Sequence, residues 1–266
     1  MKITKIGHCC LLIGVEGKRI LTDPGSFTST SQNASWVYPE YECDIKEASS
    51  EGDSPARTNA RFHPRNAPCL QAGDSGVDVF TIDELITDNI DIVLITHEHA
   101  DHVHIESLQR VIDVNPEVVI FTNSGVGKLL TDAGISYQIL EGNADTQCFG
   151  IHIEAHDAKH EEMYKEMGQV QNTGYFIADT LFYPGDSYAL PQKEVKVLAF
   201  PIGGPWCRIK DAIEYVLTIK PQKAFPVHDG IERIDRVGIL HRIPSSLFPE
   251  HDIDFIPLKA GDTAEF

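Results

Sequence analysis

The run from Thr96 to His102 combines three histidines and one aspartate within seven residues. Imidazole nitrogens bind zinc and iron well, and a carboxylate adds a harder oxygen donor. His97 and His99 are two residues apart, so in an extended segment both side chains point to one side. Asp101 continues this alternation, and a tight turn would direct His102 toward a second ion. The pattern predicts a metal site rather than a solvated, histidine-rich loop.

Further candidate ligands follow other predicted strands, where loops on a rigid scaffold tend to carry functional side chains. His152 alternates with Ile151 and Ile153, so we expect it on the opposite face of its strand. His160, four residues beyond His156, is an alternative ligand for the same place. The candidates at the strand ends are Thr96 to His102 after residues 91–95, His156 after 150–155, Asp186 after 181–185 and His228 after 224–227.

Hydrophobic periodicity predicts strands first and then, twice over, strands that alternate with helices. This order indicates two sheets packed together with helices outside. The predicted strands are 2–6, 9–15, 18–22, 91–96, 118–121, 136–140, 149–155, 174–178, 180–184, 195–201, 223–227 and 253–258, and the predicted helices are 82–86, 105–112, 123–130 and 209–217.

Residues 26–78 differ in composition and hydrophobic periodicity from the rest of the chain. They are rich in Ser, Asn, Pro, Gly and acidic residues and have little periodicity. A structureless loop of this length is uncommon inside a compact domain and is usually functional or disordered. We therefore predict a single domain over residues 1–266 with an insertion at about 26–78, which acts as a lid or an oligomer contact.

Composition limits the classes of partner. The chain has 266 residues, 42% of them hydrophobic, which is enough for a sizeable core. Its formal net charge of -18 disfavours phosphate backbones and anionic lipid surfaces. No apolar run approaches the ~20 residues of a membrane helix, and the amino terminus does not resemble a signal peptide. We expect a cytoplasmic protein that acts on a small-molecule substrate and has no nucleic-acid or membrane partners. The sequence is also compatible with a homo-oligomer.

Six cysteines are scattered without a C-x-x-C pair, which indicates free thiols in a reducing compartment. Cys9 and Cys10 follow His8, and this arrangement could suggest a thiol nucleophile. Both flank the apolar run Leu11 to Ile13, however, so we expect them to serve packing.

The spacing His97-x-His99-x-Asp101-His102 resembles the signature of the metallo-β-lactamase-fold hydrolases. Five further segments look most like the branch that contains the L-ascorbate-6-phosphate lactonase. The resemblance implies an α/β (α+β) fold, the four-layer αββα metallo-β-lactamase sandwich, with metals at one edge of the two sheets. The segments are Gly7-His8, Leu21 to Pro24, Pro184 to Ser187, Pro201 to Trp206 and Pro226 to Asp229.

The resemblance also implies roles for individual residues. Asp101 and Asp186 would be catalytic as well as ligands, and His160 would contact substrate or transfer a proton. Asp23 and His8 would orient the ligands, and Trp206 would line the substrate pocket. The cofactor would be two divalent ions, foremost zinc, with manganese or iron also accepted by such ligands. The first ion would bind His97, His99 and His156, the second would bind Asp101, His102 and His228, and Asp186 would bridge both.

The implied activity is hydrolysis of a small-molecule ester, lactone or phosphodiester by a metal-bridging hydroxide. Oxygen-reducing di-iron members of the fold carry Glu in place of His99, which favours hydrolysis over redox chemistry. The main zinc β-lactamases place a Cys where this chain has Asp186, so antibiotic hydrolysis is not expected. The alternative is a nuclease or RNA-processing phosphodiesterase of the same fold, which shares the ligands but is disfavoured by the acidic charge. A non-catalytic metal-binding scaffold is a further alternative.

Overall fold

The structure, a computed structural model, describes residues 1–25, 89–165, 167, 169–230 and 237–266. These residues belong to one compact unit. The predicted insertion at 26–78 and the predicted helix at 82–86 lie outside the described residues.

The first sheet contains seven strands in the order β14-β1-β2-β3-β4-β5-β6. Strands β14 to β3 pair antiparallel, whereas β3 to β6 pair parallel. The parallel strands therefore end on the same side. The strands are β1 (Lys2–Lys5), β2 (Leu11–Val15), β3 (Lys18–Thr22), β4 (Ile92–Leu94), β5 (Val119–Thr122), β6 (Gln138–Ile139) and β14 (Thr263–Glu265).

The second sheet contains seven strands in the order β13-β12-β11-β10-β9-β8-β7. Strands β7 to β10 pair antiparallel, and β10 to β13 pair parallel. The strands are β7 (Asp145–Cys148), β8 (Ile151–Lys159), β9 (Gln171–Ile177), β10 (Leu181–Tyr183), β11 (Val197–Pro201), β12 (Lys223–Val227) and β13 (Asp254–Phe255).

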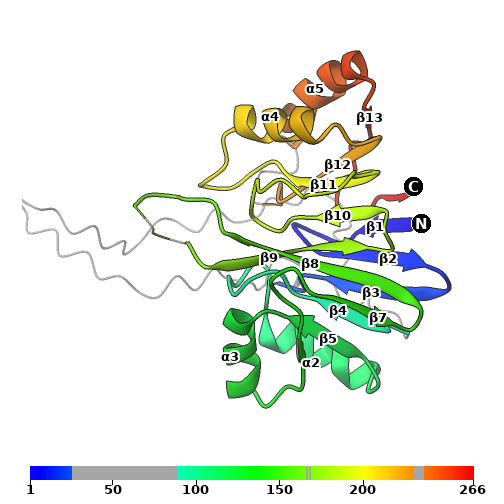
Figure 1. Ribbon diagram of the computed structural model, residues 1–266, viewed down its shortest axis with the longest axis vertical. Helices are drawn as coiled ribbons and strands as arrows, with labels where there is room; N and C mark the ends of the chain where they lie inside the picture. The colour runs from blue at the N-terminus through cyan, green and yellow to red at the C-terminus, as the bar shows by residue number, and fades with distance from the viewer. Residues whose placement is uncertain (26–88, 166, 168, 231–236) are drawn as a thin grey trace, which may run out of the picture. The chain divides into compact units, whose positions relative to one another are not determined.

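Three apolar clusters account for the layers. The central cluster joins the inner faces of the two sheets, as Ile13 and Phe225 illustrate. The outer face of the first sheet packs against α2 (Ile105–Val114) and α3 (Ser124–Asp132). The outer face of the second sheet packs against α4 (Ile209–Ile219), with α5 (Val237–Leu247) and the 3-10 helix η2 (Phe248–His251) beside it. The predicted αββα sandwich is thus confirmed (Figure 1).

Several elements differ from the sequence-based expectation. Strands β7 and β14 were not expected, because both are short and mostly polar edge strands. Helix α5 was not expected either. The strand expected at 253–258 is the short β13, which pairs with β12 at the edge of the second sheet, and β14 adds a further strand to the first sheet beside β1. Strand β8 runs to Lys159, beyond the expected end at 155. No described helix has the length and apolar character needed to cross a membrane.

Candidate metal centre

The candidate ligands come from loops that follow β4, β8, β10 and β12. Asp186, after β10 of the second sheet, lies 3.3 Å from His102 Nε2, which follows β4 of the first sheet. Gly185 makes the turn before Asp186 possible, because its φ is +64° and a Cβ there would lie 2.3 Å from Asn172 Oδ1. The same Asn172 oxygen accepts a hydrogen bond of 2.9 Å from the Asp186 N–H, which fixes the start of this loop.

A first group of ligand atoms belongs to His97, His99 and His160, with one atom of each within 4.8 Å of the others. The His97 ring lies 4.8 Å from that of His99 and 5.0 Å from that of His160. Burial holds the pKa of His97 well below its usual value, so its imidazole is neutral. The His160 Nδ1 lies 2.7 Å from the Glu161 carbonyl, which indicates that Nδ1 carries the proton and Nε2 offers its lone pair.

His156 is not part of this group. Strand β8 buries Ile151, Ile153 and Ala155 in the central core, so the alternate side chains, including His156, point to the other face. There the His156 ring lies 5.3 Å from Phe176 and 5.7 Å from Phe182. His160, at the true end of the strand, takes the place expected for His156. The alternation of side chains along the strand, which predicted that His152 points away from the core, applies equally to His156. This alternation was therefore the feature of the sequence that could have placed His156 on the outer face.

A second group surrounds His102 and His228. His228 Nε2 lies 2.8 Å from Asp186 Oδ2 and 3.4 Å from Asp101 Oδ2. Burial lowers the pKa of His8 to about 4, and its Nδ1 accepts a hydrogen bond from the Gly230 N–H. The other nitrogen of this neutral His8 therefore carries a proton toward Asp101 Oδ2, at 3.3 Å. This places His8 behind the Asp101 carboxylate, where it orients a ligand.

Asp186 lies between the two groups. Its Oδ2 is 3.2 Å from His160 Nε2 and 2.8 Å from His228 Nε2, while its Oδ1 is 3.3 Å from His102 Nε2. It is the one described carboxylate for which the structure gives contacts to histidines of both groups. The geometry is that of a carboxylate able to bridge two ions.

Asp23 organises the first-sheet side of the centre. It is fully buried, and its Oδ1 accepts a hydrogen bond of 2.8 Å from the Thr96 N–H. Its Oδ2 accepts from the Thr96 hydroxyl at 2.8 Å and from the Tyr183 hydroxyl at 2.6 Å, and it lies 2.8 Å from His102 Nδ1. The carboxylate therefore holds the His102 proton on Nδ1 and leaves Nε2 free to bind a metal. The sequence predicted no role for the Thr96 hydroxyl within the run 96–102 and gave no sign of Tyr183, because both residue types fit ordinary packing at these positions.

The donor set fits metal ions. His97 Nε2, Asp186 Oδ1 and His228 Nε2 are buried without a hydrogen-bond partner, although buried polar atoms are usually satisfied. Burial opposes charge on His228, yet Asp186 and Asp101 raise its pKa to about 9. Without a metal, the carboxylates thus raise the pKa values of His102 and His228, whereas burial keeps the pKa of His97 low. Buried carboxylates facing neutral imidazoles need positive charge between them, and divalent ions supply it.

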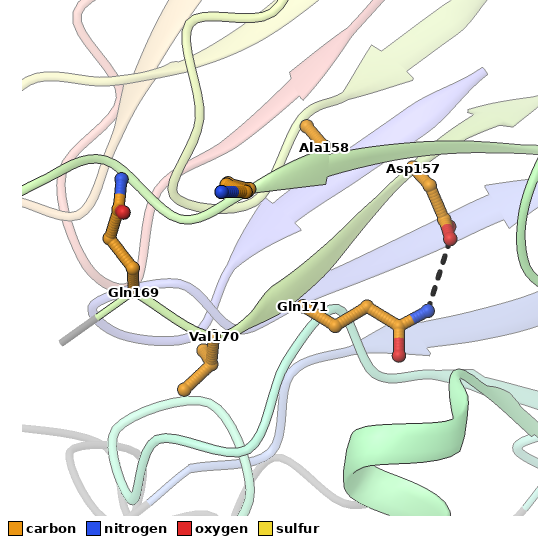
Figure 2. Close-up of a pocket in the computed structure, with 6 residues that line it drawn as sticks. Asp157, Ala158, Gln169, Val170 and Gln171 are labelled. Atoms are coloured by element: carbon orange, nitrogen blue, oxygen red, sulfur yellow. Dashed lines mark hydrogen bonds between the residues drawn. The ribbon is translucent and has the colours of Figure 1, made fainter. Parts of the chain in front are cut away.

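Trp206 and a neighbouring pocket flank the centre. The Trp206 ring lies 5.5 Å from the His160 ring and 5.3 Å from the His228 ring, so it faces both groups. A pocket of about 540 Å³ lies beside the strand end that carries His160. Figure 2 shows the hydrogen bond of 3.0 Å from Gln171 to Asp157 on its wall. The pocket is lined by Asp157, Ala158, Lys159, Gln169, Val170 and Gln171.

Two other polar clusters lie among the described residues. Lys5 is buried and its Nζ donates to Asp229 Oδ1 at 2.6 Å, while His241 Nε2 lies 2.8 Å from Asp229 Oδ2. This cluster anchors the residue after His228, and the sequence offered no sign of it, because a lysine in a short first strand reads as exposed. On the outer face of β8, His152 lies with Glu154 and Asp179, but the Lys193 ammonium already pairs with both carboxylates.

The chain belongs to the family described as the beta-lactamase superfamily domain, whose sequence model matches residues 2–228. It has the metallo-β-lactamase fold, in which two mixed sheets are flanked by helices. Protein Rv0786c of Mycobacterium tuberculosis is 23% identical over 246 residues, which cover 91% of this chain and 90% of that protein.

Solved structures that share the fold include Igni18 and a diphosphatase. Igni18, a metallo hydrolase from the archaeon Ignicoccus hospitalis, aligns with a TM-score of 0.65 and 18% identity over 100% of this chain and 98% of its own. A diphosphatase of the PhnP family aligns with a TM-score of 0.58 and 13% identity, over 100% of this chain and 97% of its own. At these identities the likeness extends to the fold alone, and not to the lactonase branch or to any substrate.

Proposed function

We propose that the chain is a dinuclear metal-dependent hydrolase of a small-molecule ester, lactone or phosphodiester. The observation that carries the proposal is the position of Asp186 between two groups of buried imidazoles. His97, His99 and His160 would hold the first ion, and Asp101, His102 and His228 the second. Zinc is the first expectation, and manganese or iron suit the same donors.

The ions would supply Lewis acidity toward a carbonyl or phosphoryl oxygen and make water nucleophilic near neutral pH. The chain's own residues prepare the ligands for this task. Asp23 keeps the proton of His102 on Nδ1, and the Glu161 carbonyl does the same for His160. His8 directs its Nε2 proton toward Asp101. Since His160 Nε2 faces Asp186, it serves better as a ligand than as a proton donor to the leaving group.

The substrate would lie between Trp206 and the pocket beside His160. Trp206 offers an apolar face next to both ligand groups. The pocket offers amide, carboxylate and ammonium groups from Gln171, Asp157 and Lys159. This combination suits a small molecule with an apolar part and several hydrogen-bonding groups. The acidic net charge of -18 favours such a substrate over a nucleic acid, and a cytoplasmic location agrees with the free thiols expected from the sequence.

The test combines metal analysis with a turnover panel. Protein expressed with zinc, manganese or iron should retain close to two ions per chain after exhaustive dialysis. It should hydrolyse members of a panel of lactones, aryl esters and bis-aryl phosphodiesters, and lose activity on chelation. A short RNA belongs in the panel, because its preferential cleavage would favour the nuclease alternative. Absence of bound metal after metal-replete expression would contradict the proposal.

A further inference from the structure

Cys9 lies among the ligands of the second group. Its side chain is buried, and its Sγ lies 3.5 Å from His102 Nε2. One ligand atom each from Cys9, His102, Asp186 and His228 lies within 4.8 Å of the others. The neighbouring Cys10 points elsewhere, into the apolar cluster between the first sheet and its helices. Of the two adjacent thiols, Cys9 is therefore surrounded by candidate metal ligands, whereas Cys10 is surrounded by apolar core side chains.

The separations match those between ligands around one zinc ion. With Zn–S of about 2.3 Å and Zn–N or Zn–O of about 2.05 Å, tetrahedral geometry puts sulfur about 3.5 Å from nitrogen and nitrogen about 3.3 Å from oxygen. The structure has 3.5 Å between Cys9 Sγ and His102 Nε2. It has 3.3 Å between His102 Nε2 and Asp186 Oδ1. These atoms are therefore spaced as ligands of a shared ion.

Two further observations favour Cys9. Asp186 Oδ1 and His228 Nε2, both in the same group of four, are buried without a hydrogen-bond partner. Asp101 Oδ2 is 3.9 Å from His102 Nε2, farther than the Cys9 sulfur, and it already faces His8. The carboxylate expected at this ion is thus less close to His102 than the thiol.

We propose that Cys9 is a thiolate ligand of the second metal ion, together with His102, Asp186 and His228, in the place that the proposed function gives to Asp101. The inference rests on the proposed function in one respect, namely that the chain binds a second ion. When that ion binds, the sulfur–metal bond replaces the S–H bond, and the proton leaves to solvent. A soft thiolate beside two imidazoles favours zinc over manganese, so Cys9 would also bias the choice of metal.

The experiment compares wild type, Cys9→Ala and Cys10→Ala, each loaded with Co²⁺ in place of the native ions. A thiolate bound to Co²⁺ gives an intense near-ultraviolet charge-transfer band that nitrogen and oxygen ligands do not give. We expect this band in wild type and in Cys10→Ala, and its loss in Cys9→Ala. Cys10→Ala is the matched control, because it removes an equally buried sulfur from the adjacent position.

X-ray absorption of the wild-type zinc protein provides a measurement that needs no variant. It should show one sulfur at about 2.3 Å per pair of zinc ions. Two bound zinc ions without a sulfur neighbour, or a cobalt band that survives in Cys9→Ala, would overturn the role of Cys9 and leave the proposed hydrolase intact. A wild-type protein that binds no second ion would contradict both proposals.

Discussion

The contrast between His156 and His160 shows how a single side chain's role depends on strand length. Both histidines are spaced four residues apart at the end of β8, and both are chemically suited to metal. Because the strand continues through Lys159, His156 stays on the outer face against Phe176 and Phe182. His160 leaves the strand and reaches the group of His97 and His99.

Replacing each of these histidines by alanine separates the two roles. His160→Ala should reduce the metal content from about two ions to about one and lower kcat by about 100-fold or more, because it removes a ligand of the first ion. His156→Ala should keep both ions and affect only stability. Metal-to-protein ratios and kcat on the best panel substrate decide the matter. Loss of metal in His156→Ala with none lost in His160→Ala would reverse our assignment.

Asp186→Asn tests the bridging carboxylate. Asn keeps the shape but loses the negative charge that offsets two nearby cations. We expect kcat to fall by about 100-fold or more, with weaker binding of the second ion and little change in the melting temperature. Turnover, metal content and thermal unfolding are measured on the same preparation. Near-wild-type activity with both ions retained would rule out bridging and leave Asp186 as a residue of the turn.

At the scale of elements, the buried Lys5–Asp229 ion pair joins β1 of the first sheet to the loop after β12 of the second. Lys5 Nζ also donates to the carbonyls of Pro226 and Leu258, at 2.9 and 3.3 Å, so all three of its hydrogens have acceptors. Burial alone would raise the pKa of Asp229, but Lys5 and His241 together lower it to about 2. The Asp229 carboxylate is therefore charged at neutral pH, and its contact with Lys5 ties the loop that carries His228 to the first strand.

Lys5→Met should destabilise the fold strongly. It leaves the Asp229 carboxylate buried with His241 as its remaining partner, which costs about 3–5 kcal/mol of unfolding free energy. Lys18→Met is the matched control, since the Lys18–Asp91 pair is 2.8 Å long but partly exposed, and its loss should cost less than about 1 kcal/mol. Urea unfolding measures both. The double variant Lys5→Met/Asp229→Asn should recover part of the loss, and equal effects of Lys5→Met and Lys18→Met would contradict this account.

At the scale of the whole molecule, the packed layers of the sandwich provide stability, and the loops at the strand ends provide the candidate site. Apolar clusters on both faces of each sheet hold the layers together, and the loops at the ends of the strands carry the ligands. The segment 26–78 lies outside the described residues and begins three positions after Asp23 in the sequence. We propose that it shapes the substrate pocket or an oligomer interface and is not needed for the core.

Deletion of residues 26–78 with a short Gly/Ser linker tests this proposal. Metal content should stay near that of the full chain, because the candidate ligands, in the run 97–102 and at His160, Asp186 and His228, all lie outside the segment. The ranking of substrates in the turnover panel, or the molar mass in solution, should change. Metal analysis, the panel and light scattering report these outcomes separately. A deletion variant that fails to fold would assign the segment to the core.

The sequence by itself determined the class of site and the class of fold. Three histidines and an aspartate in the run 97–102 fix the ligand chemistry locally, since neighbours in the chain cannot move far apart. The order of strands and helices fixes two sheets with outer helices, because each apolar face must be covered. Both inferences use short-range information, and the structure agrees with the second of them in its layers.

Only the tertiary structure decided which distant side chains meet. His160 rather than His156 joins the first group because the hydrogen-bonded register of β8 with β9 extends to Lys159. Cys9 faces His102 while Cys10 enters the core, because both lie in the bend between β1 and β2, and the packing of the two sheets around that bend decides where each side chain points. The Lys5–Asp229 pair spans 224 positions of sequence, so no local pattern could reveal it. Contacts across the sandwich depend on register and on layer packing, which neither composition nor periodicity contains.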